Sequence, residues 1–126
     1  MSHLVILALF IVPFSVSAAG LTCDTRPAKD TAASALPGLA KISKAEAEKK
    51  ALARIKARST QILSAELEIE QGCLVYSFDI RISGKSGVEE IMIDAGTGKI
   101  VSHKHETAKQ EAAEQAKDKE TSKKGR

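Results

Sequence analysis

The sequence predicts an α+β fold, in which one N-terminal amphipathic helix packs on a small antiparallel sheet of three to four strands. Between Lys41 and Ser59 the apolar residues recur with the spacing of a helix. From Ala65 onward they alternate with polar residues, as in strands that bury one face. Short glycine-containing segments separate the alternating runs, and turns of this length join neighbouring antiparallel strands.

The predicted helix has a clear start. Ser43 is followed three residues later by Glu46, which is the spacing of a capping box, where each side chain bonds the other residue's backbone N–H. A mostly alanine face allows the helix to lie close to the sheet that it covers. The residues on this face are Ala47, Ala51, Leu52 and Ile55.

The alternating runs predict which side of each strand is buried. In residues 65–70 every second residue is a glutamate, and an acidic outward side keeps a strand soluble and discourages edge pairing. The third run, residues 89–94, buries Ile91 and Ile93, and residues 99–102 continue the sheet after a turn. The second run places five apolar side chains on one face: Leu74, Tyr76, Phe78, Ile80 and Ile82.

Two glycine-lysine stretches, residues 83–87 and 95–100, have the look of phosphate-binding loops. Such a loop needs a glycine five residues before its Gly-Lys pair, but Asp79 and Ile93 occupy those positions. Asp94, Thr97 and Gly98 are instead typical of a tight turn, because Asp and Thr bond nearby backbone and Gly accepts positive φ. Both stretches are therefore predicted to be hairpin turns.

The order and spacing of three segments resemble the PepSY domain family. The resemblance runs from Lys41 to His103 and marks Tyr76, Asp94, Thr97 and Gly98 as residues of the family pattern. The three segments are "IS" before the alanine-rich helix, "VYSFDI" in a strand, and "IMIDAGTGKIVS" at the close of the sheet.

This resemblance implies a function. PepSY domains occur in propeptides of thermolysin-type metallopeptidases, where they are implicated in inhibiting or chaperoning the peptidase. They also occur alone in small secreted proteins and in membrane-associated sensory or reductase-like proteins. The resemblance therefore implies a secreted, non-enzymatic binding module that regulates a peptidase of the cell envelope and needs no cofactor. The alternative is a sensory or accessory protein that binds a small ligand, a sensor kinase or a membrane reductase.

The ends of the chain differ from its middle. Residues 1–19 contain an uncharged apolar run that is shorter than the ~20 residues of a membrane span and ends in small residues, which predicts a signal peptide. The protein would then be periplasmic or secreted, without a transmembrane span after cleavage; an uncleaved anchor is the alternative. Residues 20–40 read as a flexible linker, 41–103 as the PepSY-like domain, and 104–126 as a charged, mobile tail.

Cys23 and Cys73 are able to pair in an oxidising compartment, whereas two unpaired thiols, or lipid attachment at Cys23, remain open. His103 and His105 alternate near a strand end and are weak candidates for a metal site with Glu106. No nucleophile and base can be paired from the sequence, so no catalytic residues are predicted.

Composition and charge indicate which classes of partner the protein can bind. Aromatic residues make up 3% of the chain and there is no Trp, which argues against nucleic-acid binding through stacked bases. Basic residues outnumber acidic ones by seven to two between Lys41 and Ser59, and the ratio is reversed between Ser64 and Ala95. The helix side is thus predicted to be basic and the sheet side acidic, a charge separation that can orient a protein partner.

Overall fold

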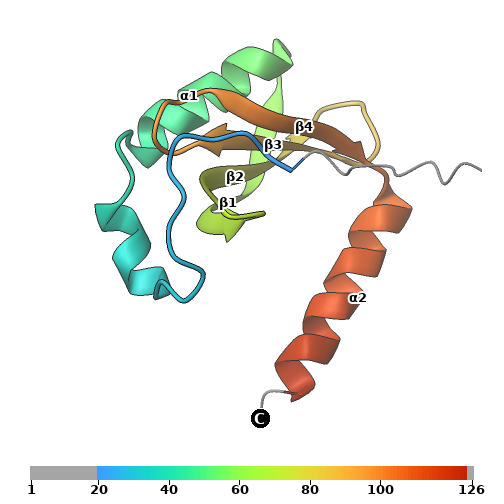
Figure 1. Ribbon diagram of the computed structural model, residues 1–126. Helices are drawn as coiled ribbons and strands as arrows, with labels where there is room; N and C mark the ends of the chain where they lie inside the picture. Colours follow the sequence, from blue (N-terminus) through green and yellow to red (C-terminus); the bar gives the residue numbers. More distant parts are fainter. Residues whose placement is uncertain (1–19, 125–126) are drawn as a thin grey trace, which may run out of the picture.

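The computed structural model describes residues 20–124 and shows a four-stranded antiparallel sheet with one helix packed on it (Figure 1). The strands lie in the order β1-β2-β3-β4, so each pairs with its neighbour in sequence. The predicted α+β class is confirmed. The elements are η1 (Ala33–Gly38), α1 (Lys44–Ile55), β1 (Thr60–Glu70), β2 (Cys73–Ile82), β3 (Val88–Asp94), β4 (Ile100–Glu106) and α2 (Ala108–Lys124).

Helix α1 begins at the predicted capping box. The backbone N–H of Glu46 donates to Ser43 Oγ at 3.2 Å, and the Ser43 N–H donates to Glu46 Oε2 at 2.9 Å. Ala47 and Ala51 are completely buried against the sheet, so the small side chains of this face bring the helix backbone close to the strands. The helix ends at Ile55, and Lys56 takes the left-handed conformation that commonly closes a helix.

The main core lies between α1 and the sheet. In β2 the even-numbered residues face the helix, and Phe78 lies between Ala65 of β1 and Ile91 of β3. The Tyr76 hydroxyl donates to the Ile42 carbonyl at 3.0 Å, which joins the middle of the sheet to the start of α1. The fully buried large side chains of this core are Leu74, Phe78, Ile80, Ile91 and Ile93.

Strand β1 is longer than the alternation in the sequence indicates. It starts at Thr60, and its pairing with β2 shifts register between Ile62 and Ser64. Leu63 is the extra residue of this β-bulge, and its side chain is 38% exposed. A bulge reverses which residues face the core, so a pattern of period two is interrupted at that point.

The segment predicted as a linker, residues 20–40, packs on the domain. Leu36 of η1 is buried in the main core, and the Leu74 N–H of β2 donates to the Thr25 carbonyl at 2.9 Å. These contacts join residues far apart in the chain, whereas the Ala, Thr and Pro content that indicated a linker is a local signal. Residues 20–26 are called the N-terminal segment below.

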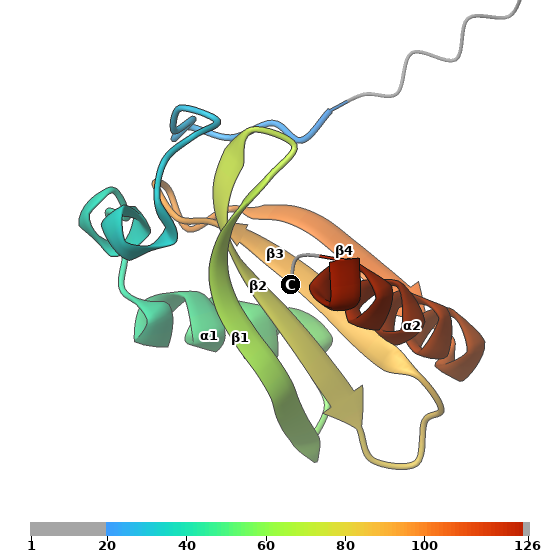
Figure 2. The same cartoon turned by 90° about the horizontal axis from the view of Figure 1, so that it is seen from below.

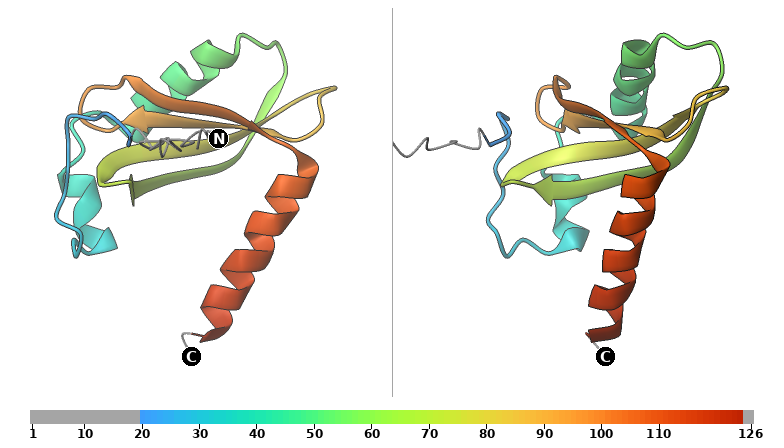
Figure 3. Two further views of the ribbon diagram at one scale, coloured as in Figure 1. Left: turned by 45° about the vertical axis from the view of Figure 1, so that its right-hand side comes forward. Right: turned by 90° about the vertical axis from the view of Figure 1, so that its right-hand side faces the viewer.

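The last part of the chain also has regular structure. β4 continues three residues past the predicted domain end, to Glu106, and α2 follows. A second capping box starts α2, since Thr107 N donates to Gln110 Oε1 at 3.0 Å and Gln110 N to Thr107 Oγ1 at 3.3 Å. α2 extends from the end of β4 on the side of the sheet opposite α1 (Figures 2 and 3).

None of the helices within residues 20–124 is long and apolar enough to cross a membrane. The predicted signal peptide, residues 1–19, lies outside the described residues.

Candidate interaction surface

The turn between β3 and β4 is held by one buried carboxylate. Asp94 is 2% exposed and accepts hydrogen bonds from Gly96 N at 2.8 Å and Thr97 Oγ1 at 3.1 Å. Its third bond comes from the backbone N–H of Asp24 at 2.8 Å, so the same carboxylate fastens the N-terminal segment. Burial acts to raise the pKa of Asp94, but these hydrogen bonds outweigh burial and hold the pKa below its ordinary value.

The same turn also fastens α1. The Ala95 carbonyl accepts from Lys41 N at 2.9 Å and Ile42 N at 3.1 Å, just before the helix begins. Gly98 has φ +76°, which favours glycine. The residues that carried the family resemblance therefore build a junction between the sheet, α1 and the N-terminal segment, and none of these hydrogen bonds points to a catalytic role.

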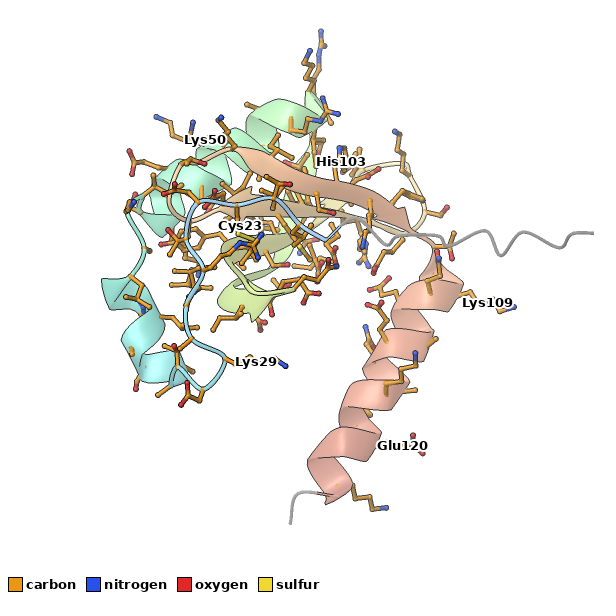
Figure 4. The ribbon with its side chains drawn as sticks, in the orientation of Figure 1. Cys23, Lys29, Lys50, His103, Lys109 and Glu120 are labelled. Carbon is orange, nitrogen blue, oxygen red and sulfur yellow. A yellow bond between two sulfur atoms is a disulfide. The ribbon has the colours of Figure 1, made fainter. Side chains whose placement is uncertain are left out.

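The structure joins Cys23 to Cys73 by a disulfide, with sulfurs 2.02 Å and Cα atoms 5.8 Å apart. Cys23 lies on the N-terminal segment where it passes over the sheet (Figure 4). The bond holds Leu21 and Cys23 over a small second core made of Cys73, Val75 and Met92, on the face of the sheet opposite α1. The N-terminal segment thus covers one end of that face. The sequence had left open whether Cys23 and Cys73 pair.

His103 and His105 do lie on the same side of β4, but their partner is Glu89 rather than Glu106. His103 Nε2 lies 3.0 Å from one Glu89 oxygen and His105 Nδ1 lies 3.2 Å from the other. β4 pairs with β3 so that His105 is opposite Glu89, whereas Glu106 alternates to the other face. Partial burial acts to raise the pKa of Glu89, but the bonds from the two imidazoles outweigh it and lower that pKa.

Arg54 of α1 completes this cluster, because its Nε donates to His103 Nδ1 at 3.3 Å. His103 is therefore bonded at both nitrogens, to α1 and to β3, and Figure 4 shows it on β4 beneath the helix. No group of three His, Cys, Asp or Glu side chains within the described residues is arranged to hold a metal ion. The cluster is a polar link between α1 and the sheet.

The face of the sheet opposite α1, called the open face below, carries most of the acidic residues of the strands. Carboxylates lie near one another both along and across strands: Glu68 has Glu66 and Glu70 on the same side of β1, and Glu90 is opposite Asp79. Burial, and then repulsion by neighbouring carboxylates, raises the pKa of Glu68 and Glu90. The acidic side chains of the open face are Glu66, Glu68, Glu70, Asp79, Glu90 and Glu106.

Helix α2 adds to this surface where it leaves the sheet. Glu111 forms an ion pair with Arg81 of β2, in which Oε1 and Nη2 are 3.7 Å apart. The charge of Glu114 helps to raise the pKa of Glu106, after the larger contribution of burial, so the first turns of α2 lie near the acidic strands. The sequence identified the acidic side of β1 but gave no sign that α2 would stand beside it.

Comparison with known protein families agrees with this architecture. Residues 41–104, about half of the chain, match PepSY, the peptidase propeptide and YPEB domain. The chain belongs to the PepSY family. The match begins two residues before the α1 cap and ends within β4, so α2 and the N-terminal segment lie outside it. Neither the curated proteins nor the solved structures that were compared contain a match to this chain.

Proposed function

We propose that this protein is an extracytoplasmic, non-enzymatic PepSY module that regulates a peptidase of the cell envelope by binding to it through the open face. The observation that carries the proposal is the difference between the two faces of the sheet. α1 covers one face, whereas within residues 20–124 the N-terminal segment and the first turns of α2 lie over only parts of the other. A sheet face that folding leaves uncovered is available to a partner.

The scaffold suits a regulator that has to survive contact with a peptidase. β2 and β3 are hydrogen-bonded on both sides, so their backbone groups are not free to pair with a protease groove, whereas β1 and β4 are paired on one side each. The disulfide ties the N-terminal segment to β2, which limits local opening of that end. A disulfide of this kind and the predicted signal peptide both favour a location outside the cytoplasm.

The test is an inhibition and binding assay with the exported chain and a panel of purified peptidases from the cell envelope. We expect one peptidase to form a stable complex with the chain and to lose activity as the chain approaches one equivalent. The chain should remain intact during the assay. If every peptidase keeps its full activity and none binds, the proposed function is wrong.

A second candidate function, as a sensory protein that binds a small ligand, is favoured by a shallow cavity at the β2–β3 hairpin. The cavity has a volume of about 490 Å³. Its lining offers an ammonium, a hydroxyl, a carboxylate and an imidazole, from Lys85, Ser86, Glu89 and His105 together with Gly84. A library of small polar metabolites should then contain one that raises the melting temperature of the chain and fails to do so for Lys85→Ala.

A further inference from the structure

The open face presents its carboxylates in rows instead of around one point. Glu66, Glu68 and Glu70 are alternate residues of one strand, which places neighbouring carboxylates about 7 Å apart. No three of the described acidic or histidine side chains converge on a site for a metal ion. A single small cation therefore does not match this face, whereas a row of separate positive groups does.

Positive charge on the open face is scarce. Lys104 is opposite Glu90, and Arg81 is paired with Glu111 of α2. Lys109, at the start of α2, points away from the sheet (Figure 4). Within residues 20–124 no ion pair joins the carboxylates of β1 to any of these cations, so this part of the face holds an excess of negative charge.

Two carboxylates of the open face are half-buried, which makes their charged state costly in free energy. Glu68 and Glu90 are only partly exposed, in contrast to side chains that extend freely into water. Burial, and then repulsion by carboxylates near each of them, raises the pKa of both, so keeping each one charged in the folded protein costs free energy. A positive group placed beside either carboxylate would remove part of that cost.

We propose that the open face binds an extended segment of a partner protein that carries Lys or Arg at every second residue. Alternate side chains of an extended segment are about 7 Å apart on one side, which equals the spacing of the carboxylates along β1. This inference rests on the proposed function and specifies the chemistry by which a regulated peptidase would be recognised. It also makes anionic partners, such as nucleic acid or an acidic lipid surface, a poor match for this face.

The probe is an end-blocked eight-residue peptide of alternating Lys and Thr, and the protein is the exported chain with its disulfide intact. The comparison peptide has the same composition, but its four Lys are contiguous. We expect the alternating peptide to bind more tightly, and the double variant Glu68→Gln/Glu90→Gln to weaken binding about fivefold at low salt. Raising the salt to about 0.5 M should remove most of the difference, because exposed charges are then screened.

A matched control variant removes two acidic groups elsewhere. Glu48→Gln/Asp30→Asn changes the net charge by the same amount but alters α1 and the segment before η1. It should bind the alternating peptide as the parent does. If the two double variants bind this peptide equally, or if the two peptides bind the parent equally, the inference is wrong.

Two further outcomes separate this inference from the proposed function. A peptidase that binds the parent and Glu68→Gln/Glu90→Gln with equal affinity would overturn the inference and leave the regulatory function standing. Binding of the alternating peptide with no peptidase partner would do the reverse. Sedimentation of the parent at low salt tests a second copy as the occupant, and self-association lost in Glu68→Gln/Glu90→Gln would also overturn the inference.

Discussion

The two faces of the sheet are built from the same strands but differ in burial and in charge. In β2, Phe78 is completely buried under α1, and its neighbour Ser77 lies half-buried on the open face. The face of the sheet under α1, called the helix face below, is mostly apolar, apart from the cluster in which the histidines of β4 meet Glu89 of β3. The open face combines a small disulfide-bound apolar end with a larger acidic area. The requirements of folding account for the first face, whereas burial of a core does not require the acidic area.

The largest expected effect tests this difference directly. Phe78→Ala should lower the free energy of unfolding by about 4 kcal/mol, because it empties the centre of the main core. Ser77→Ala, one residue away and on the other face, should change it by about 0.5 kcal/mol or less. Urea unfolding of both variants measures the two values. Similar losses for both would show that the open face is part of the core.

The next effect concerns the disulfide-bound apolar end of the open face. Replacing Cys23 and Cys73 by Ala should cost about 3 kcal/mol, because the disulfide closes a span of 50 residues and holds the N-terminal segment in place. Thermal unfolding of the variant, beside the parent with and without reductant, measures this loss. The reduced parent should resemble the variant. If reductant has no effect on the parent, the disulfide does not form in solution.

The helix face could be predicted from the sequence because its signals are local. Ser43 and Glu46 are three residues apart, and the apolar residues of β2 show strict alternation, so capping and burial follow from near neighbours. The same reasoning was available for α2, where Thr107 and Gln110 have capping-box spacing, but the absence of large apolar residues favoured a tail. Local periodicity failed at two irregularities of the sheet, at Leu63 in β1 and at Val101 in β4, where the pairing shifts register.

The candidate site was less predictable because it depends on contacts between distant residues. Asp94 was identified as a turn residue, but its bond to the backbone of Asp24 joins positions 70 residues apart. The choice of Glu106 over Glu89 as the partner of the histidines is instructive. Alternation alone excludes Glu106, since it is one residue from His105, whereas Glu89 can be found only once β3 is known to pair with β4.

A smaller effect tests the junction that fastens the N-terminal segment to both the sheet and α1. Asp94→Asn should cost about 2 kcal/mol at pH 7, because a buried carboxylate loses charge-assisted hydrogen bonds. The pKa of Asp94 is lowered in the folded state, so this stability is present above the unfolded pKa of about 3.9 and is lost as pH falls through the folded pKa. Parent and variant should therefore converge in acid, and a gap that stays constant to pH 2 would contradict the assignment.

The smallest effect has the opposite sign and belongs to the acidic area. The pKa of Glu68 and Glu90 is raised in the folded state, so their contribution to stability is fully present below the unfolded pKa of about 4.3 and is lost as pH rises through the folded pKa. Glu68→Gln should thus raise the free energy of unfolding at pH 7, by about 0.5 kcal/mol, since water screens a half-buried charge. Denaturant midpoints at pH 7 and pH 4 measure the gain, which should shrink at the lower pH. A loss of stability at pH 7 would mean that Glu68 has a stabilising partner in the free protein, and would remove the reason to expect a basic partner at this face.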